Sequence, residues 1–99
     1  MDHRYLVDAR RYSDSTIGLL RNVPQQRPDP IAQRDAVSNL GVIQSRLEHL
    51  DPALRDLLAE PLQEALAAAQ AGQLGLTLAY MESVQKVLKA AEDASAASS

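Results

Sequence analysis

The feature that most constrains the fold of this chain is a stripe of apolar residues spaced alternately four and three apart. Such steps keep side chains on one side of a helix that has 3.6 residues per turn. Three successive runs carry the stripe: Ala36, Leu40, Ile43, Leu47 and Leu50; Leu54, Leu58, Pro61, Ala65 and Ala68; Thr77, Met81, Val84, Leu88 and Ala91. The chain is therefore predicted to be all-α, built from amphipathic helices that pack on one another.

Apolar residues with the same spacing occur near the N-terminus and predict a first helix over 2–22. The stripe that they form consists of Tyr5, Ala9, Tyr12, Thr16, Leu19 and Val23, widened by Leu6, Ile17 and Leu20. The polar triplet Ser13-Asp14-Ser15 interrupts this segment, because short polar side chains compete for backbone hydrogen bonds. Two short helices, the second capped by Ser13 or Asp14, are the alternative. The stripe keeps its phase across the triplet, which favours one helix.

Prolines and glycines mark the other boundaries. Three prolines within residues 24–30 predict a linker, after which Asp29 caps a second helix with Pro30 at its first position. Asp51-Pro52 repeats this signature, and Gly72 is a typical left-handed residue after a helix. The prediction is an up-and-down bundle of about four helices, over residues 2–22, 30–50, 52–71 and 76–91.

Proline 61 falls inside the third of these helices. Proline lacks the backbone N–H and clashes with the preceding turn, so it kinks or breaks a helix. Because the stripe passes through this position without losing phase, a kink is predicted in place of an end. The residues around it that are expected to stay buried are Leu57, Leu58, Leu62, Ala65 and Leu66. Residues 1–91 are expected to form one helical domain, followed by a disordered tail over 92–99.

Composition limits the class of protein. The chain has no cysteine, a formal net charge of −3, and an N-terminus (Met-Asp-His-Arg) without an apolar signal region. No apolar run approaches the roughly twenty residues that span a bilayer. A cytoplasmic protein without membrane segments is expected, and the Ala-, Leu- and Arg-rich composition favours a bacterial or phage origin.

No pattern in the sequence points to catalysis or to a cofactor, and the two histidines do not stand at a metal-binding spacing, so the chain is expected not to be an enzyme. Asp56, Glu60 and Glu64 stand four apart and predict an acidic ridge on the outer face of the third helix. The ridge is a candidate docking stripe for a basic partner or a set of oxygen ligands for a divalent cation. A solvated face is the simplest alternative, although like charges at this spacing mildly destabilise a helix.

Basic and aromatic residues gather on the first helix, where Arg10 and Arg11 stand close to Tyr5 and Tyr12. Arginine beside stacking tyrosine is a plausible contact for single-stranded nucleic acid. Both tyrosines belong to the apolar stripe, however, which places them against the core or a second subunit. The extra apolar surface of this helix predicts a homodimer.

These observations favour a small non-enzymatic helical module for protein–protein interaction, such as an adaptor, chaperone, inhibitor or regulatory subunit, whose partner is another protein. A nucleic-acid-associated protein that uses the N-terminal arginines is the alternative, disfavoured by the acidic net charge. A structural subunit of a larger assembly is the second alternative, since it would be built from the same helices.

Overall fold

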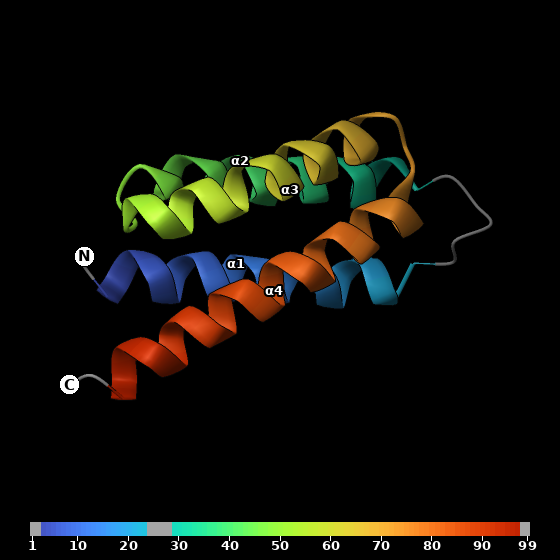
Figure 1. Cartoon of the computed structure of the whole chain (residues 1–99). Helices are drawn as coiled ribbons and strands as arrows, with labels where there is room; N and C mark the ends of the chain where they lie inside the picture. The colour runs from blue at the N-terminus through green and yellow to red at the C-terminus, as the bar shows by residue number, and fades with distance from the viewer. Residues whose placement is uncertain (1–2, 24–28, 98–99) are drawn as a thin grey trace.

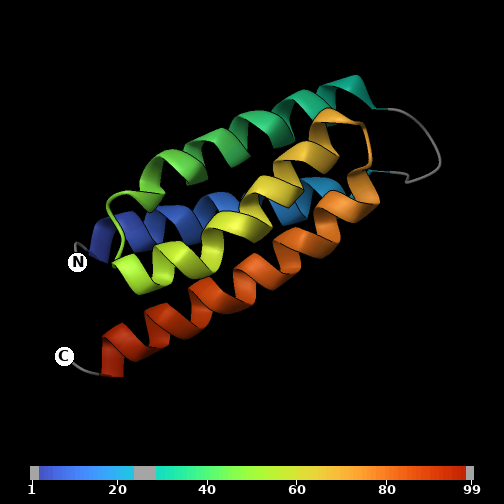
Figure 2. The same ribbon diagram turned by 45° about the horizontal axis from the view of Figure 1, so that its top comes forward.

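Four antiparallel helices make up the computed structural model, which describes residues 3–23 and 29–97 (Figure 1). They are α1 (His3–Arg21), α2 (Pro30–Leu47), α3 (Pro52–Gln70) and α4 (Leu74–Ala97). Each helix packs on the next in the chain, and α4 returns to pack on α1, which closes the ring (Figure 2). The predicted all-α, up-and-down bundle of four helices is confirmed.

The first helix is continuous through Ser13-Asp14-Ser15, as the unbroken stripe predicted. The alternative of two short helices is wrong. Tertiary contacts account for Asp14 of the triplet but not for Ser13. Ser13 lies in the interior, whereas the Asp14 carboxylate accepts a hydrogen bond from Gln85 of α4. Neither side chain caps a new helix.

The ends of α2 follow the predicted signals only in part. The Asp29 carboxylate accepts a hydrogen bond from the Ala32 amide at 2.9 Å, which is the predicted N-cap, and residues 24–28 of the predicted linker lie outside the described residues. The helix ends at Leu47, three residues earlier than predicted. Beyond it the chain tightens into a turn in which the Leu50 amide donates to the Leu47 carbonyl at 3.0 Å. Leu50 remains buried, so it keeps its place in the core without being helical.

The third helix runs through Pro61 without interruption, which confirms that this proline does not end it. Asp51 precedes it but makes no capping hydrogen bond with its side chain, unlike Asp29. The helix ends at Gln70, and the turn after it contains Gly72, whose φ of 77° is left-handed. The Gly72 amide donates to the Ala69 carbonyl and the Gln73 amide to the Ala68 carbonyl, at 3.0 and 2.9 Å. This pair of bonds is a Schellman motif, which favours glycine at that position.

The fourth helix is longer than predicted at both ends. It begins at Leu74 and reaches Ala97, so residues 92–97 continue the helix where a disordered tail was expected. Residues 98 and 99 lie outside the described part of the chain. The extension contacts α1, because Glu92 pairs with Arg10 and the Ser95 hydroxyl lies 3.4 Å from Nδ1 of His3. These partners are far away in sequence, which is why local composition did not predict the extension.

The core is built from one face of each helix. The buried side of α1 differs from the predicted stripe by a rotation of about one residue, because α1 packs against both α2 and α4. Tyr12 is therefore 37% exposed, and Tyr5 and Leu19 are only partly buried. The buried residues of this helix are Leu6, Ala9, Ser13, Thr16, Ile17 and Leu20.

Leucine 57 corrects a second prediction about burial. It is 64% exposed, whereas its neighbour Leu58 is fully buried. Consecutive residues lie about 100° apart around a helix, so only one of the two leucines can face the bundle centre. Leu62 and Ala65 are buried as predicted, and Leu66 packs partly against the core.

Two glycines, Gly18 of α1 and Gly41 of α2, lie in the middle of helices on exposed surface. A Cβ atom added at either position would have no neighbour within 4 Å. Exposed glycine in a helix interior costs about 1 kcal/mol relative to alanine. Gly18→Ala and Gly41→Ala are each expected to raise the free energy of unfolding by about 1 kcal/mol, measured by urea denaturation. An unchanged or lower stability would contradict the open space around these positions.

Candidate partner-binding surfaces

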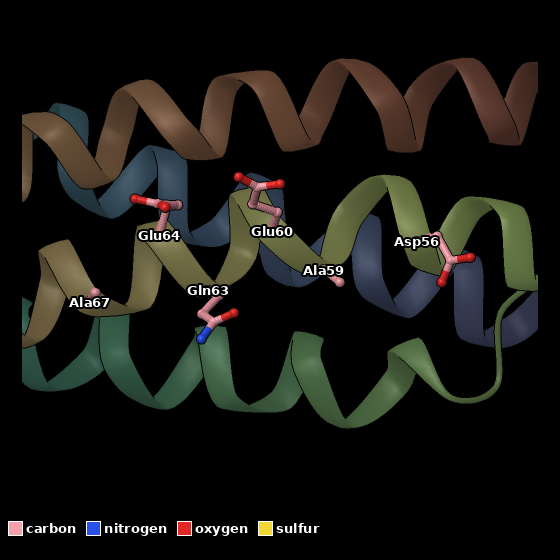
Figure 3. Close-up of a pocket in the computed structure, with 6 residues that line it drawn as sticks. All are labelled: Asp56, Ala59, Glu60, Gln63, Glu64 and Ala67. Carbon is pink, nitrogen blue, oxygen red and sulfur yellow. The ribbon is translucent and has the colours of Figure 1, made fainter.

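The outward side of α3 presents three carboxylates and one exposed leucine, which we call the α3 face: Asp56, Leu57, Glu60 and Glu64. The carboxylates line an open, shallow hollow with Ala59, Gln63 and Ala67 (Figure 3). In this view the side chains of Glu60 and Glu64 lie on the side of α3 toward α4, and Gln63 lies on the side toward α2. The predicted acidic ridge is thus on the surface, and all three of its members share one hollow.

The carboxylates of the α3 face are only weakly compensated. Asp56 lies 3.7 Å from the guanidinium of its neighbour Arg55, and Tyr80 of α4 donates a long hydrogen bond to Glu64 at 3.4 Å. Glu60 has no hydrogen bond or ion pair with any residue that the structure describes. Spacings of four bring these like charges together along the helix, which destabilises it by a few tenths of a kcal/mol per pair.

Leu57 adds an exposed apolar side chain to the α3 face, at a position that the sequence predicted to be buried. A second shallow hollow adjoins it, lined by Glu60, Pro61, Glu64 and Tyr80. Single exposed leucines are common on protein surfaces. This one stands out because carboxylates flank it and a proline and a tyrosine lie nearby. The combination offers an apolar contact and a negative rim on one helix face.

The fold separates the basic and aromatic residues of α1 that the sequence placed together. Arg10 lies at the seam with α4, where it pairs with Asp14 at 2.8 Å and with Glu92. The hydrogen bond from its guanidinium to Glu92 raises the pKa of Arg10 above its ordinary value, and the two carboxylates add to this effect by attraction. Arg21 also reaches α4, at 3.3 Å from Glu82. Two of the α1 arginines therefore pair with carboxylates of α4 across the seam.

Arg11, Tyr5 and Tyr12 have surroundings different from those of Arg10. Arg11 is exposed and has no ion pair among the described residues, and it borders a shallow hollow with Asp8, Tyr12 and Ser15. Tyr5 stacks on the ring of His49, with 4.1 Å between ring centroids. The structure therefore does not join Arg10, Arg11, Tyr5 and Tyr12 into one surface.

Comparison of the chain with protein-family models, curated proteins and solved structures found no match. Within residues 3–23 and 29–97, no group of three or more His, Asp or Glu residues is arranged to hold a metal ion. None of the helices described is long and apolar enough to cross a membrane.

The contacts of Arg10 yield a prediction about the end of α4. Arg10→Ala removes both ion pairs at the seam, so the turns of α4 around Glu92 should open more often. We expect amide hydrogen exchange near Glu92 to quicken roughly fivefold, which corresponds to about 1 kcal/mol for a partly exposed pair. Arg11→Ala is the matched control and should leave that exchange unchanged. Equal effects of the two variants would contradict the role of the seam.

Proposed function

We propose that this chain is a non-enzymatic protein–protein interaction module of the cytoplasm that binds a cationic partner segment through the α3 face. The observation that carries the proposal is the exposure of Leu57 beside three carboxylates. Exposed apolar side chains with a polar rim are the usual anatomy of a protein-binding patch. The roles consistent with such a surface are those of an adaptor, chaperone, inhibitor or regulatory subunit.

The electrostatics of the α3 face support a cationic partner. Glu60 has no compensating charge among the described residues, and only one long hydrogen bond from Tyr80 reaches Glu64. A basic segment docked here would relieve the repulsion along α3 and cover Leu57 at the same time. Such complementarity speeds association and selects among partners, even where its share of the affinity is small.

The experiment uses a synthetic helical peptide of lysine and leucine at helical spacing as the probe, with a glutamate-for-lysine version as its control. We expect the cationic peptide to bind with salt-dependent affinity and to shift the NMR signals of α3 around Leu57. Leu57→Ser combined with Glu60→Gln and Glu64→Gln should weaken binding at least tenfold, about 1.4 kcal/mol. Asp93→Asn removes an exposed carboxylate of α4 and should have no effect. Equal binding by all variants would overturn the proposal.

The same titration with a single-stranded oligonucleotide separates this proposal from nucleic-acid binding. Arg10 and Arg21 are already paired with α4 carboxylates, so few cations remain for phosphate. We expect no binding at physiological salt. Submicromolar, salt-sensitive binding that weakens in an Arg10→Ala, Arg11→Ala variant would favour the nucleic-acid alternative.

A further inference from the structure

The bundle is divided into two halves of opposite charge. The helices α1 and α2 together carry six arginines and three aspartates, a net charge of +3. The helices α3 and α4 carry three basic residues and six carboxylates, a net charge of −3. The two pairs form opposite layers, with α3 and α4 in front of α2 and α1 in Figure 1. One layer is therefore basic in sum and the other acidic, and part of this charge is paired across the seam, where Arg10 and Arg21 of α1 lie against Glu92 and Glu82 of α4.

The basic layer presents the same short pattern twice. Residues 11–20 of α1 read Arg-Tyr-Ser-Asp-Ser-Thr-Ile-Gly-Leu-Leu, and residues 34–43 of α2 read Arg-Asp-Ala-Val-Ser-Asn-Leu-Gly-Val-Ile. The two segments share arginine, serine and glycine at the first, fifth and eighth positions. In both helices these three positions are exposed, whereas the seventh and tenth, which are apolar, are buried.

This repetition gives α1 and α2 one kind of outer surface, which we call the Arg/Gly face: Arg11, Ser15, Gly18, Arg34, Ser38 and Gly41. Arginine and glycine stand seven residues apart on each helix, so they share a side. Nothing within the chain explains the glycines, because the space beyond each is open. A helix of another molecule can approach the backbone closely at such positions, with the arginines beside it.

We propose that the Arg/Gly face of one copy binds the α3 face of a second copy, so that chains associate head to tail. This inference rests on the proposed function of the α3 face and identifies the cationic partner as a second copy of the chain. Arg10 and Arg21 are paired within the molecule, so the complementarity is between the exposed Arg11 and Arg34 and the carboxylates of the α3 face. Of these two arginines, Arg34 also lies 3.6 Å from the carboxylate of its neighbour Asp35. Glu60 and Glu64 would meet Arg11 and Arg34, while Leu57 packs over the small residues between them.

A two-fold dimer is not the geometry that these charges favour. Pairing two Arg/Gly faces or two α3 faces would place like charges opposite one another. Association between unlike faces leaves one of each unpaired at the ends, so further copies can add until a ring closes. The homodimer predicted from the apolar surface of α1 is a separate prediction, and most of that surface is now buried within the chain.

Two variants that each block one face test the proposal by light scattering and sedimentation. Gly18→Gln with Gly41→Gln fills the Arg/Gly face with good helix formers, and Leu57→Ser with Glu60→Gln and Glu64→Gln alters the α3 face. The unchanged chain is expected to form species larger than a dimer between about 10 and 500 μM and to dissociate in high salt. Each variant alone should stay monomeric. An equimolar mixture should form heterodimers and stop there, since only one productive pair of faces remains.

Three outcomes would overturn this inference, and they separate it from the proposed function. A chain that stays monomeric while the cationic peptide still binds at Leu57 would refute self-association and leave the proposed function standing. A dimer that both variants retain would indicate a two-fold interface elsewhere. Oligomers that persist in the mixture would show that the two faces do not bind each other. Circular dichroism of each variant confirms that it is folded.

Discussion

Leu58→Ala is expected to destabilise the protein by about 2–5 kcal/mol, whereas the same change at Leu57 should alter stability by less than about 0.5 kcal/mol. Leu58 is fully buried among the core side chains, and truncating it removes apolar contact and leaves a cavity. Leu57 is 64% exposed, so replacing it with alanine removes little apolar contact. A chain of 99 residues has a total stability of roughly 5–15 kcal/mol, so the first change removes a large share of it.

Urea denaturation followed by circular dichroism measures both variants. With slopes of about 1–3 kcal/mol per molar urea, Leu58→Ala should lower the midpoint by about 1 M or more, and Leu57→Ala should leave it nearly unchanged. The two leucines are adjacent and chemically identical, so each controls for the other. Similar midpoint shifts would mean that α3 is rotated so that Leu57 also faces the core, and the α3 face would then lose its exposed leucine.

Ser13→Ala is expected to stabilise the bundle by roughly 1–2 kcal/mol. Ser13 is fully buried in α1, and its hydroxyl has no hydrogen-bond partner within the described structure. Burying a hydroxyl without a partner costs about 1–3 kcal/mol, and alanine fills the site without that cost. Alanine also has the higher helix propensity, by a few tenths of a kcal/mol.

The matched control for this change is Ser15→Ala, two residues along the same helix. Ser15 is exposed, so its replacement should add only the difference in helix propensity. The stabilisation at Ser13 should therefore exceed that at Ser15 in thermal or urea denaturation. Equal effects, or a loss of stability at Ser13, would indicate that its hydroxyl is satisfied by water or by a partner.

The periodicity of the sequence determined the fold class. Spacings of four and three place apolar side chains on one side of any helix, whatever lies next to it, so four helices and their approximate ends follow from local rules. The cap at Asp29 and the left-handed turn at Gly72 are local in the same sense, because each depends on the geometry of one residue and its nearest neighbours. The continuation of α3 through Pro61 was also predictable, because the spacing of the apolar residues is unbroken there.

The candidate site was predictable only as an acidic ridge. Asp56, Glu60 and Glu64 fall on one side of α3 by spacing alone. Whether a neighbouring helix would neutralise them, and which of Leu57 and Leu58 would be buried, depends on where α2 and α4 lie around α3. The sequence assigned both leucines to the core because both sit within the wide apolar arc, and packing selected one.

Tertiary structure alone decided the features that join distant parts of the chain. The final turns of α4 lack large apolar residues, yet they are helical where Glu92 meets Arg10, 82 positions earlier in the sequence. The buried side of α1 is set by two neighbours at once, which moves Tyr12 outward and Ser13 inward. Local sequence specifies that a helix forms and which arc of it is apolar. The centre of that arc, and the partner of each charge, are set when the four helices close into a ring.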